Sequence, residues 1–254
     1  LCSSEDNCTC VGTPLIAWIS PLDASSTPNG APGNFITIGG KYFGQTAGQV
    51  VFLGDPETNT DDKLASFPDS VNPNCANFWQ NDQIIVIVPS GAVDGPIKVV
   101  AANKKEDMTD NDRGPHINDF DVNDLKRPGL CLSDPDSGFF ADKFNLQGNS
   151  FAGVSQGVFF GTEKASTTAN NISNWTNTSV DATVPNIAAG RNAVFINAAG
   201  ASSNSLKFKI EDNSLKDPAI DYIEPPQGPA GQYVTIYGRN FGLYEGGKSM
   251  VKFY

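Results

Sequence analysis

Aspartates crowd the segment from Asp107 to Asp124, and oxygen-rich clusters of this kind are what Ca²⁺ requires. Within it, Asp110-Asn-Asp112-Arg-Gly resembles the first part of a calcium-binding loop. The candidate calcium ligands are therefore Asp107, Asp110 and Asp112. No glutamate follows at the position where such loops place their bidentate ligand, so a solvated acidic loop is the alternative interpretation. No other cofactor is predicted.

His116 is the only histidine, and a triad of nucleophile, base and acid would depend on it. Asp112, Asp119 and Asp121 lie near His116 in sequence, but no Gly-x-Ser-x-Gly turn supplies a nucleophile. His116 also falls at the start of a predicted strand, where a solvated side chain needs no special role. The sequence thus predicts no enzyme and no catalytic residue.

The acceptor motif for N-linked glycans, Asn-x-Ser/Thr, begins at Asn7, Asn171, Asn174 and Asn177. Three of these asparagines fall within residues 171–179, in a polar segment beside a predicted strand. We expect a sugar-bearing surface there if the source organism glycosylates this motif. The alternative is that none of the asparagines is modified.

The chain has five cysteines: Cys2, Cys8, Cys10, Cys75 and Cys131. Cys8 and Cys10 are too close together for the usual zinc motif, and one histidine cannot complete a site. Disulfides are the better interpretation, and they indicate an oxidising compartment. The spacing does not reveal the pairing. The odd number leaves one thiol for a neighbouring chain, a missing segment or no partner.

These residues must be positioned by a chain that repeats one short pattern. Its clearest copy is Val234-Thr-Ile-Tyr-Gly-Arg-Asn-Phe-Gly242, and earlier copies begin at Ile36 and Phe144. In each copy two apolar residues alternate with polar ones, as in a half-buried strand, and a glycine follows. We predict that the glycine occupies a place that a Cβ would obstruct, and that the phenylalanine three residues later returns to the core.

The tryptophans extend the repeat, because Trp79 precedes Pro89 by the same interval that separates Trp175 from Pro185. Aromatic residues at equivalent positions indicate core packing rather than a carbohydrate-binding platform. The matches predict four parts: a cysteine-bearing arm at 1–13, repeats at 14–123 and 124–212, and a partial third repeat at 217–254.

Composition favours an all-β protein. Charged residues are only 18% of the chain, and we find no sustained helical period among its short β-branched and aromatic runs. The net charge of −11 argues against nucleic-acid binding, which depends on basic patches. The longest apolar run, Ile84 to Pro89, has the length of one strand, so no membrane span is predicted.

The repeat resembles the Ig-like, plexin, transcription-factor module called IPT or TIG. Ile220, Ile223 and Pro225 match its Ile-x-x-Ile-x-Pro opening. Residues 234–242 match its signature, and Ser203-Asn204 matches its ending. The resemblance implies tandem Ig-like β-sandwiches, two complete and a third partial. It also implies a structural or adhesive role outside the cell, because the members that contact DNA do so through basic loops that this chain lacks.

We therefore predict a non-enzymatic extracellular structural protein, the self-assembling subunit of a surface fibre or filament. Half a sandwich exposes an unpaired edge and an open core, which strands of a neighbouring protomer would complete. The predicted assembly interface comprises Val234, Ile236, Phe241, Val251 and Phe253.

Two alternatives stay open for the function. The chain is a fragment of a cell-surface adhesin or receptor stalk that binds glycans or proteins, or it is an accessory module of a secreted glycan-degrading enzyme. The expected partners are accordingly other copies of the chain, or a cell-surface protein or glycan.

Overall fold

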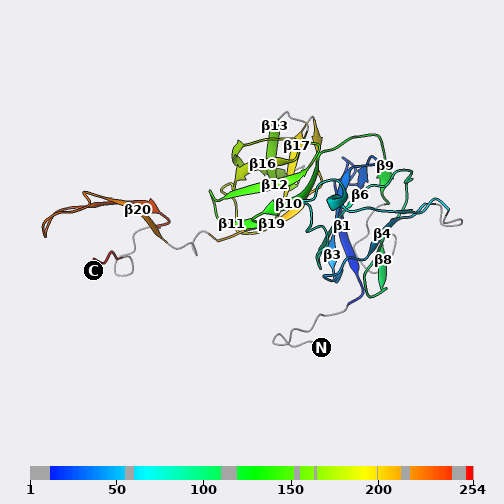
Figure 1. The fold of residues 1–254 in the computed structure, drawn as a ribbon, viewed down its shortest axis with the longest axis horizontal. Helices are drawn as coiled ribbons and strands as arrows, with labels where there is room; N and C mark the ends of the chain where they lie inside the picture. Colours follow the sequence, from blue (N-terminus) through cyan, green and yellow to red (C-terminus); the bar gives the residue numbers. More distant parts are fainter. Residues whose placement is uncertain are drawn as a thin grey trace.

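The structure, a computed structural model, describes residues 12–54, 60–109, 119–151, 155–162, 165–198, 200–212, 218–241 and 250–253. These residues form two β-sandwiches and a separate β-hairpin (Figure 1). The only helix among them is a short 3-10 turn, Pro68–Ser70. The predicted all-β fold class, with two complete sandwiches and a partial third unit, is confirmed. Among the described residues, no helix has the length and apolarity needed to cross a membrane.

The first sandwich packs a three-stranded sheet against a four-stranded one. The three-stranded sheet has the order β1 (Leu15–Ser20), β3 (Phe35–Lys41) and β6 (Gln83–Ile87). The four-stranded sheet has the order β5 (Lys63–Leu64), β4 (Gln49–Phe52), β7 (Ile97–Val100) and β8 (Glu106–Met108). A short parallel pair, β2 (Asn29–Gly30) with β9 (Asp121–Val122), lies beside them. Alternate residues of β3 and β6, such as Ile36 and Val86, fill the core between the sheets.

The second sandwich repeats this plan. One sheet has the order β10 (Gly129–Asp134), β12 (Lys143–Asn149), β16 (Ser179–Thr183) and β15 (Asn170–Ser173). The other has the order β11 (Ser137–Gly138), β19 (Leu206–Ile210), β17 (Gly190–Ala198), β13 (Ser155–Thr162) and β14 (Ala165–Thr168), and β18 (Ala201–Ser202) pairs with β17. Phe144, Phe160 and Phe208 make ring contacts at 5.0 to 5.6 Å in the core.

The signature glycines have the role that the sequence predicts. A Cβ on Gly40 would overlap the carbonyl oxygen of the neighbouring strand and the ring of Phe43, and Gly148 has the same surroundings. Phe43 and Phe151 are both 0% exposed, so the two rings return to the core as predicted. The tryptophans complete the motif, because the indole N–H of Trp79 donates to the carbonyl of Phe43, at 3.3 Å, as that of Trp175 does to Phe151.

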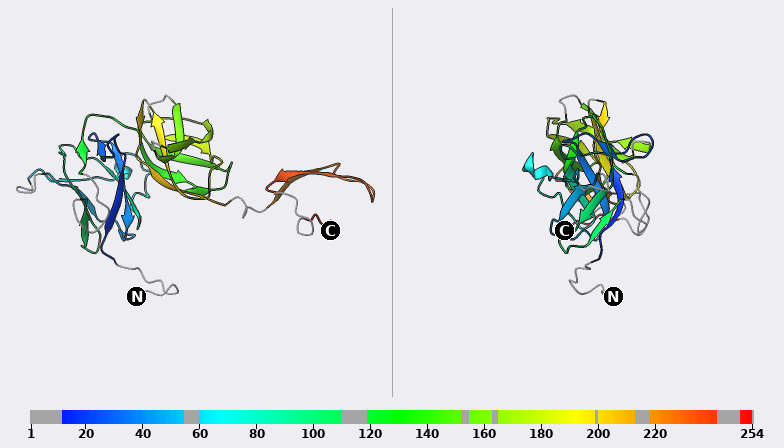
Figure 2. Two further views of the ribbon diagram at one scale, coloured as in Figure 1. Left: turned by 180° about the vertical axis from the view of Figure 1, so that it is seen from behind. Right: turned by 90° about the vertical axis from the view of Figure 1, so that its right-hand side faces the viewer.

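The third copy of the signature is a hairpin of β20 (Ala219–Glu224) and β21 (Thr235–Arg239). It lies apart from the sandwiches in the left-hand view of Figure 2. Gly238 packs against the Ala219 carbonyl and the Phe241 ring as its counterparts do. Phe241, however, is 48% exposed. Within the described residues no further strand pairs with either edge of this hairpin.

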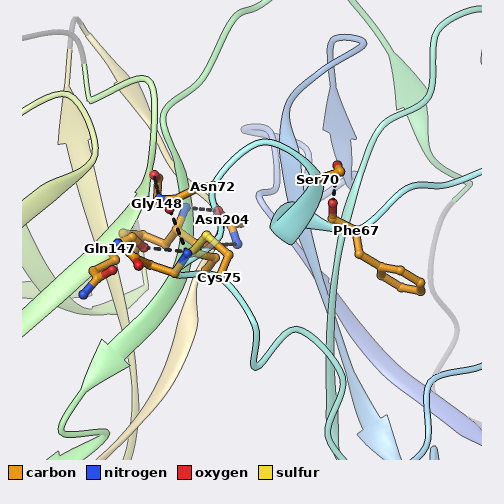
Figure 3. The surroundings of a disulfide bond; sticks show 10 residues. Phe67, Ser70, Asn72, Cys75, Gln147, Gly148 and Asn204 are labelled. Atoms are coloured by element: carbon orange, nitrogen blue, oxygen red, sulfur yellow. Dashed lines mark hydrogen bonds between the residues drawn. A yellow bond between two sulfur atoms is a disulfide. The ribbon is translucent and has the colours of Figure 1, made fainter.

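A disulfide joins the two sandwiches. Cys75 follows the 3-10 turn of the first sandwich and Cys131 lies on β10 of the second, with their Cα atoms 5.3 Å apart (Figure 3). The amide of Asn72 donates beside it to the Gly148 carbonyl at 2.7 Å. Both cysteines were predicted disulfide candidates, and the structure supplies their pairing. Cys2, Cys8 and Cys10 lie outside the described residues.

The same joint buries apolar and polar groups. Phe35, Ile85 and Ile87 belong to one buried cluster with the core of the second sandwich. Asn204, fully buried, donates to the Thr37 hydroxyl and to the Leu130 carbonyl, each at 2.8 Å. Because buried polar groups that are paired across an interface hold its geometry, we describe the two sandwiches as one firmly joined unit.

Candidate binding groove

A groove of about 620 Å³ crosses the outer face of the second sandwich. It lies over β12, β15 and β16, and the buried Phe144 and Ala182 contribute to its lining. Its polar lining residues are Asp134, Lys143, Asn145, Asn171, Ser173, Asn174, Asp181 and Thr183. The volume falls within the range that small-ligand sites occupy.

Asp181 organises the polar side of this groove. Its two carboxylate oxygens accept hydrogen bonds of 2.6 Å from the amides of Asn145 and Asn174. The bond from Asn174, with that from Asn145, lowers the pKa of the Asp181 carboxyl below its ordinary value, since both favour the charged form. The Asn145 amide also donates to the Ser179 hydroxyl at 2.9 Å. The groove therefore holds a fixed negative charge between oriented amides.

Two asparagines face the groove because of the local backbone conformation. Asn171 lies on β15, and Asn174 directly follows this strand. Asn171 and Asn174 have left-handed φ angles of 46° and 49°, a conformation that asparagine tolerates better than most residues. Their amides reach the neighbouring strand, where Asn171 contacts the Thr183 hydroxyl at 3.5 Å. Two of the predicted glycosylation sites thus lie in the groove.

Register identifies the counterpart of this face in the first sandwich. β3 pairs with β6 as β12 pairs with β16, so each position has an equivalent. In the first sandwich the outward positions are Phe35, Thr37, Ile85 and Ile87. In the second sandwich they are Lys143, Asn145, Asp181 and Thr183. In the first sandwich this face is mainly apolar, and the second sandwich covers it. In the second sandwich the equivalent face is polar and open.

The side chains of this arrangement suit hydrogen bonding to a ligand. The charged residues of the lining are Asp134, Lys143 and Asp181, and the described lining residues include no cysteine or histidine. Phe144, the only aromatic residue among them, is buried. Ligand affinity would therefore come from amide, carboxylate and hydroxyl groups.

The predicted calcium ligands are only partly described. Asp107 is buried, and its carboxylate accepts a 2.7 Å hydrogen bond from the Ile16 amide, which ties β8 to β1. Asp110, Asp112 and His116 lie outside the described residues. No group of three or more acidic, histidine or cysteine side chains suited to a metal occurs in the part of the chain that the structure describes. The calcium site stays a prediction.

The other predicted site residues have mixed surroundings. Asn7 lies outside the described residues, and Asn177 is exposed but does not line the groove. In the hairpin region Val234, Phe241, Val251 and Phe253 are exposed and Ile236 is half-buried. The assembly interface stays a prediction.

Sequence reasoning missed Lys143, Asn145, Asp181 and Thr183. A signal was present, because the second copy of the repeat carries polar residues where the first carries Phe35, Ile85 and Ile87.

The chain matches no known family profile and no curated protein. Solved structures with partial likeness include a surface glycan-binding protein of Prevotella bryantii, at 15% identity and a TM-score of 0.28, covering 80% of this chain and 43% of that one. A second is SGBP-B from a complex xyloglucan utilization locus in Bacteroides uniformis, at 13% identity and a TM-score of 0.29, covering 84% of this chain and 55% of that one. A third is the gamma-CGTase of alkalophilic Bacillus clarkii, at 13% identity and a TM-score of 0.30, covering 69% of this chain and 22% of that one. This chain spans only part of each, and at these scores the likenesses carry no argument.

Proposed function

We propose that this chain is a non-enzymatic, extracellular cell-surface module that binds a glycan in the groove of its second sandwich. The observation that carries the proposal is the change of the outward face of β12 and β16 from apolar to polar between repeats. A face meant only to be covered by a neighbouring sandwich would keep its apolar residues, as the first repeat does. The disulfide between the sandwiches supports an oxidising compartment.

The chemistry of the groove suits a hydroxyl-rich ligand. Saccharide hydroxyls both donate and accept, and the groove offers a carboxylate acceptor, amides and a lysine side by side. Since Asp181 keeps its charge, an anionic sugar would be repelled locally, and a neutral saccharide fits better. With no exposed aromatic ring in the described lining, we expect weak affinity, with dissociation constants on the order of 1 mM.

Nuclear magnetic resonance titration of the full chain tests this proposal. The probes are cellohexaose, mannohexaose and xylohexaose, three neutral linear saccharides. We expect at least one to shift the amide signals of β12, β15 and β16. Asp181→Ala removes a charged acceptor and should weaken that binding about 10-fold. Asp69→Ala, which removes an exposed carboxylate of the first sandwich, is the matched control.

The proposal fails if none of the three saccharides shifts groove signals at a concentration of about ten times the expected dissociation constant. It also fails if Asp69→Ala weakens binding as much as Asp181→Ala does. That the chain belongs to the IPT/TIG family remains a proposal. A stalk fragment and an accessory module of a secreted enzyme would use the groove in the same way.

A second candidate function, assembly into a fibre, is favoured by the hairpin. Tyr233, Phe241 and Phe253 are 96%, 48% and 73% exposed, and a lone two-stranded hairpin is at best marginally stable. A strand from a second copy would pair with β21 as β6 pairs with β3. Light scattering and electron microscopy across a concentration series would reveal assemblies, and a monomer at every concentration would rule this candidate out.

A further inference from the structure

We infer that an N-linked glycan on Asn174 closes the groove, so that this modification and ligand binding exclude one another. The inference rests on the proposed function for its biological meaning. Its geometry stands separately, because Asn174 begins the acceptor motif Asn174-Trp-Thr176 and also lines the groove. The side chain that would carry the sugar is one of the two that hold Asp181.

The atom that would be modified points into the groove. The side-chain amide nitrogen of Asn174, Nδ2, donates to one carboxylate oxygen of Asp181 at 2.6 Å. The amide of Asn145 donates to the other oxygen of the same carboxylate. Asn174 itself is exposed, so the motif is open to the solvent as well as to the groove. A sugar bonded to Nδ2 therefore begins at the polar side of the groove.

The chemistry is ordinary group transfer. An oligosaccharide carried on a lipid diphosphate forms a bond from its anomeric carbon to Nδ2, the bond to the diphosphate breaks, and the nitrogen loses one proton. The asparagine side chain keeps a single N–H. That N–H either stays on Asp181 or turns away, and in both cases the first sugar ring occupies space that a free saccharide would need.

The neighbouring acceptor motif offers a natural contrast. Asn177 begins Asn177-Thr-Ser179, but it does not line the groove, and its backbone carbonyl accepts from the amide of Phe151. A glycan on Asn177 would begin outside the groove. The two sites, three residues apart, are thus expected to differ in effect although they present the same chemical motif.

The test removes the Asn174 motif through a residue outside the groove lining. Thr176 does not line the groove, and its hydroxyl donates to the Ser179 carbonyl at 3.2 Å in the turn. Thr176→Val abolishes the Asn174 motif, while Thr176→Ser keeps it. All proteins carry Ser173→Ala, which removes the Asn171 motif. Because Ser173 lines the groove, this change is present in every protein compared, and the unglycosylated Ser173→Ala chain is the reference for binding. Each is made in a glycosylating and in a non-glycosylating host, and peptide mass mapping reports occupancy.

Two measurements read out closure. One is titration with the hexasaccharide that the unmodified chain binds best, for which we expect at least a 10-fold loss when Asn174 is occupied. The other needs no ligand: a soluble gadolinium chelate should broaden the Asn145 side-chain amide signal less when the glycan is present. Thr176→Val should behave alike from both hosts, and Asn177→Gln should leave both readouts unchanged.

The outcomes separate the two proposals. Absence of any glycan on Asn174 in the glycosylating host overturns the inference. So does an occupied Asn174 with an Asn145 amide as accessible as before. If no hexasaccharide binds the unmodified chain, the proposed function fails, while the accessibility of the Asn145 amide still decides whether the glycan closes the groove.

Discussion

At the scale of single residues, the charge of Asp181 depends on two neighbouring amides. Its pKa is lowered first by the hydrogen bond from Asn174 and then by that from Asn145. A carboxyl whose pKa is lower in the folded state stabilises the fold above its unfolded pKa, and this contribution disappears as the pH falls through the folded value. Asp181 should therefore stay ionised at a pH low enough to protonate an aspartate with an ordinary pKa, and the groove keeps its negative charge there.

Asn174→Ala is expected to raise the pKa of Asp181 toward its ordinary value, because the largest lowering contribution is removed. Carbon NMR of the side-chain carboxyl during an acid titration measures this. Asn177→Ala, which alters a nearby asparagine outside the groove, should leave the titration unchanged. An Asp181 pKa that does not move in Asn174→Ala would contradict the assigned hydrogen bond.

Gly148 illustrates how one residue sets the geometry of a repeat. Gly148→Ala would place a Cβ against the Gly129 carbonyl and the Phe151 ring. The carbonyl cannot move away without disturbing the β10–β12 pairing. We expect a loss of about 3 kcal/mol in the free energy of unfolding, measured by urea titration. At Gly30 an added Cβ has only ordinary contacts, so Gly30→Ala should cost less than about 1 kcal/mol.

At the scale of elements, the strands of the repeat could be predicted because alternation and glycine position report local geometry. The sequence alternation of residues 144–148 already indicated which side chains of β12 enter the core. It could not indicate the groove, since Asn145 and Asp181 are 36 residues apart and meet only through the register of β12 with β16. The Cys75–Cys131 pairing likewise depends on how two sandwiches dock, which spacing does not encode.

The disulfide should stabilise the joint between the elements it links. It closes a loop across 56 residues of sequence, and bridges of this kind typically contribute about 2–4 kcal/mol. Cys75→Ala with Cys131→Ala should lower the urea midpoint of unfolding accordingly, followed by tryptophan fluorescence. In dithiothreitol the unsubstituted chain should approach the double variant. If the unsubstituted chain and the double variant have equal urea midpoints without reductant, the non-covalent contacts alone account for the stability of the joint.

At the scale of the whole molecule, two parts of the chain differ in how completely they are enclosed. The sandwiches share a buried cluster, a disulfide and the hydrogen bonds of Asn204. Lys207 adds an ion pair of 2.7 Å with Asp82 across the joint, and burial lowers the pKa of its ammonium group. The hairpin has the same signature residues, but in the described part of the chain nothing covers its apolar face.

This difference predicts a contrast in amide hydrogen exchange. β12 is paired on both edges, with β10 and β16, whereas among the described residues β21 is paired only with β20. Because an uncovered two-stranded hairpin opens at little free-energy cost, we expect β21 amides to exchange within seconds while β12 amides persist for hours. At low concentration, protection of β21 equal to that of β12 would contradict this and would show that other residues of the same chain cover it. Protection that appears only as concentration rises would instead identify a second copy as the cover, and would favour assembly through this hairpin.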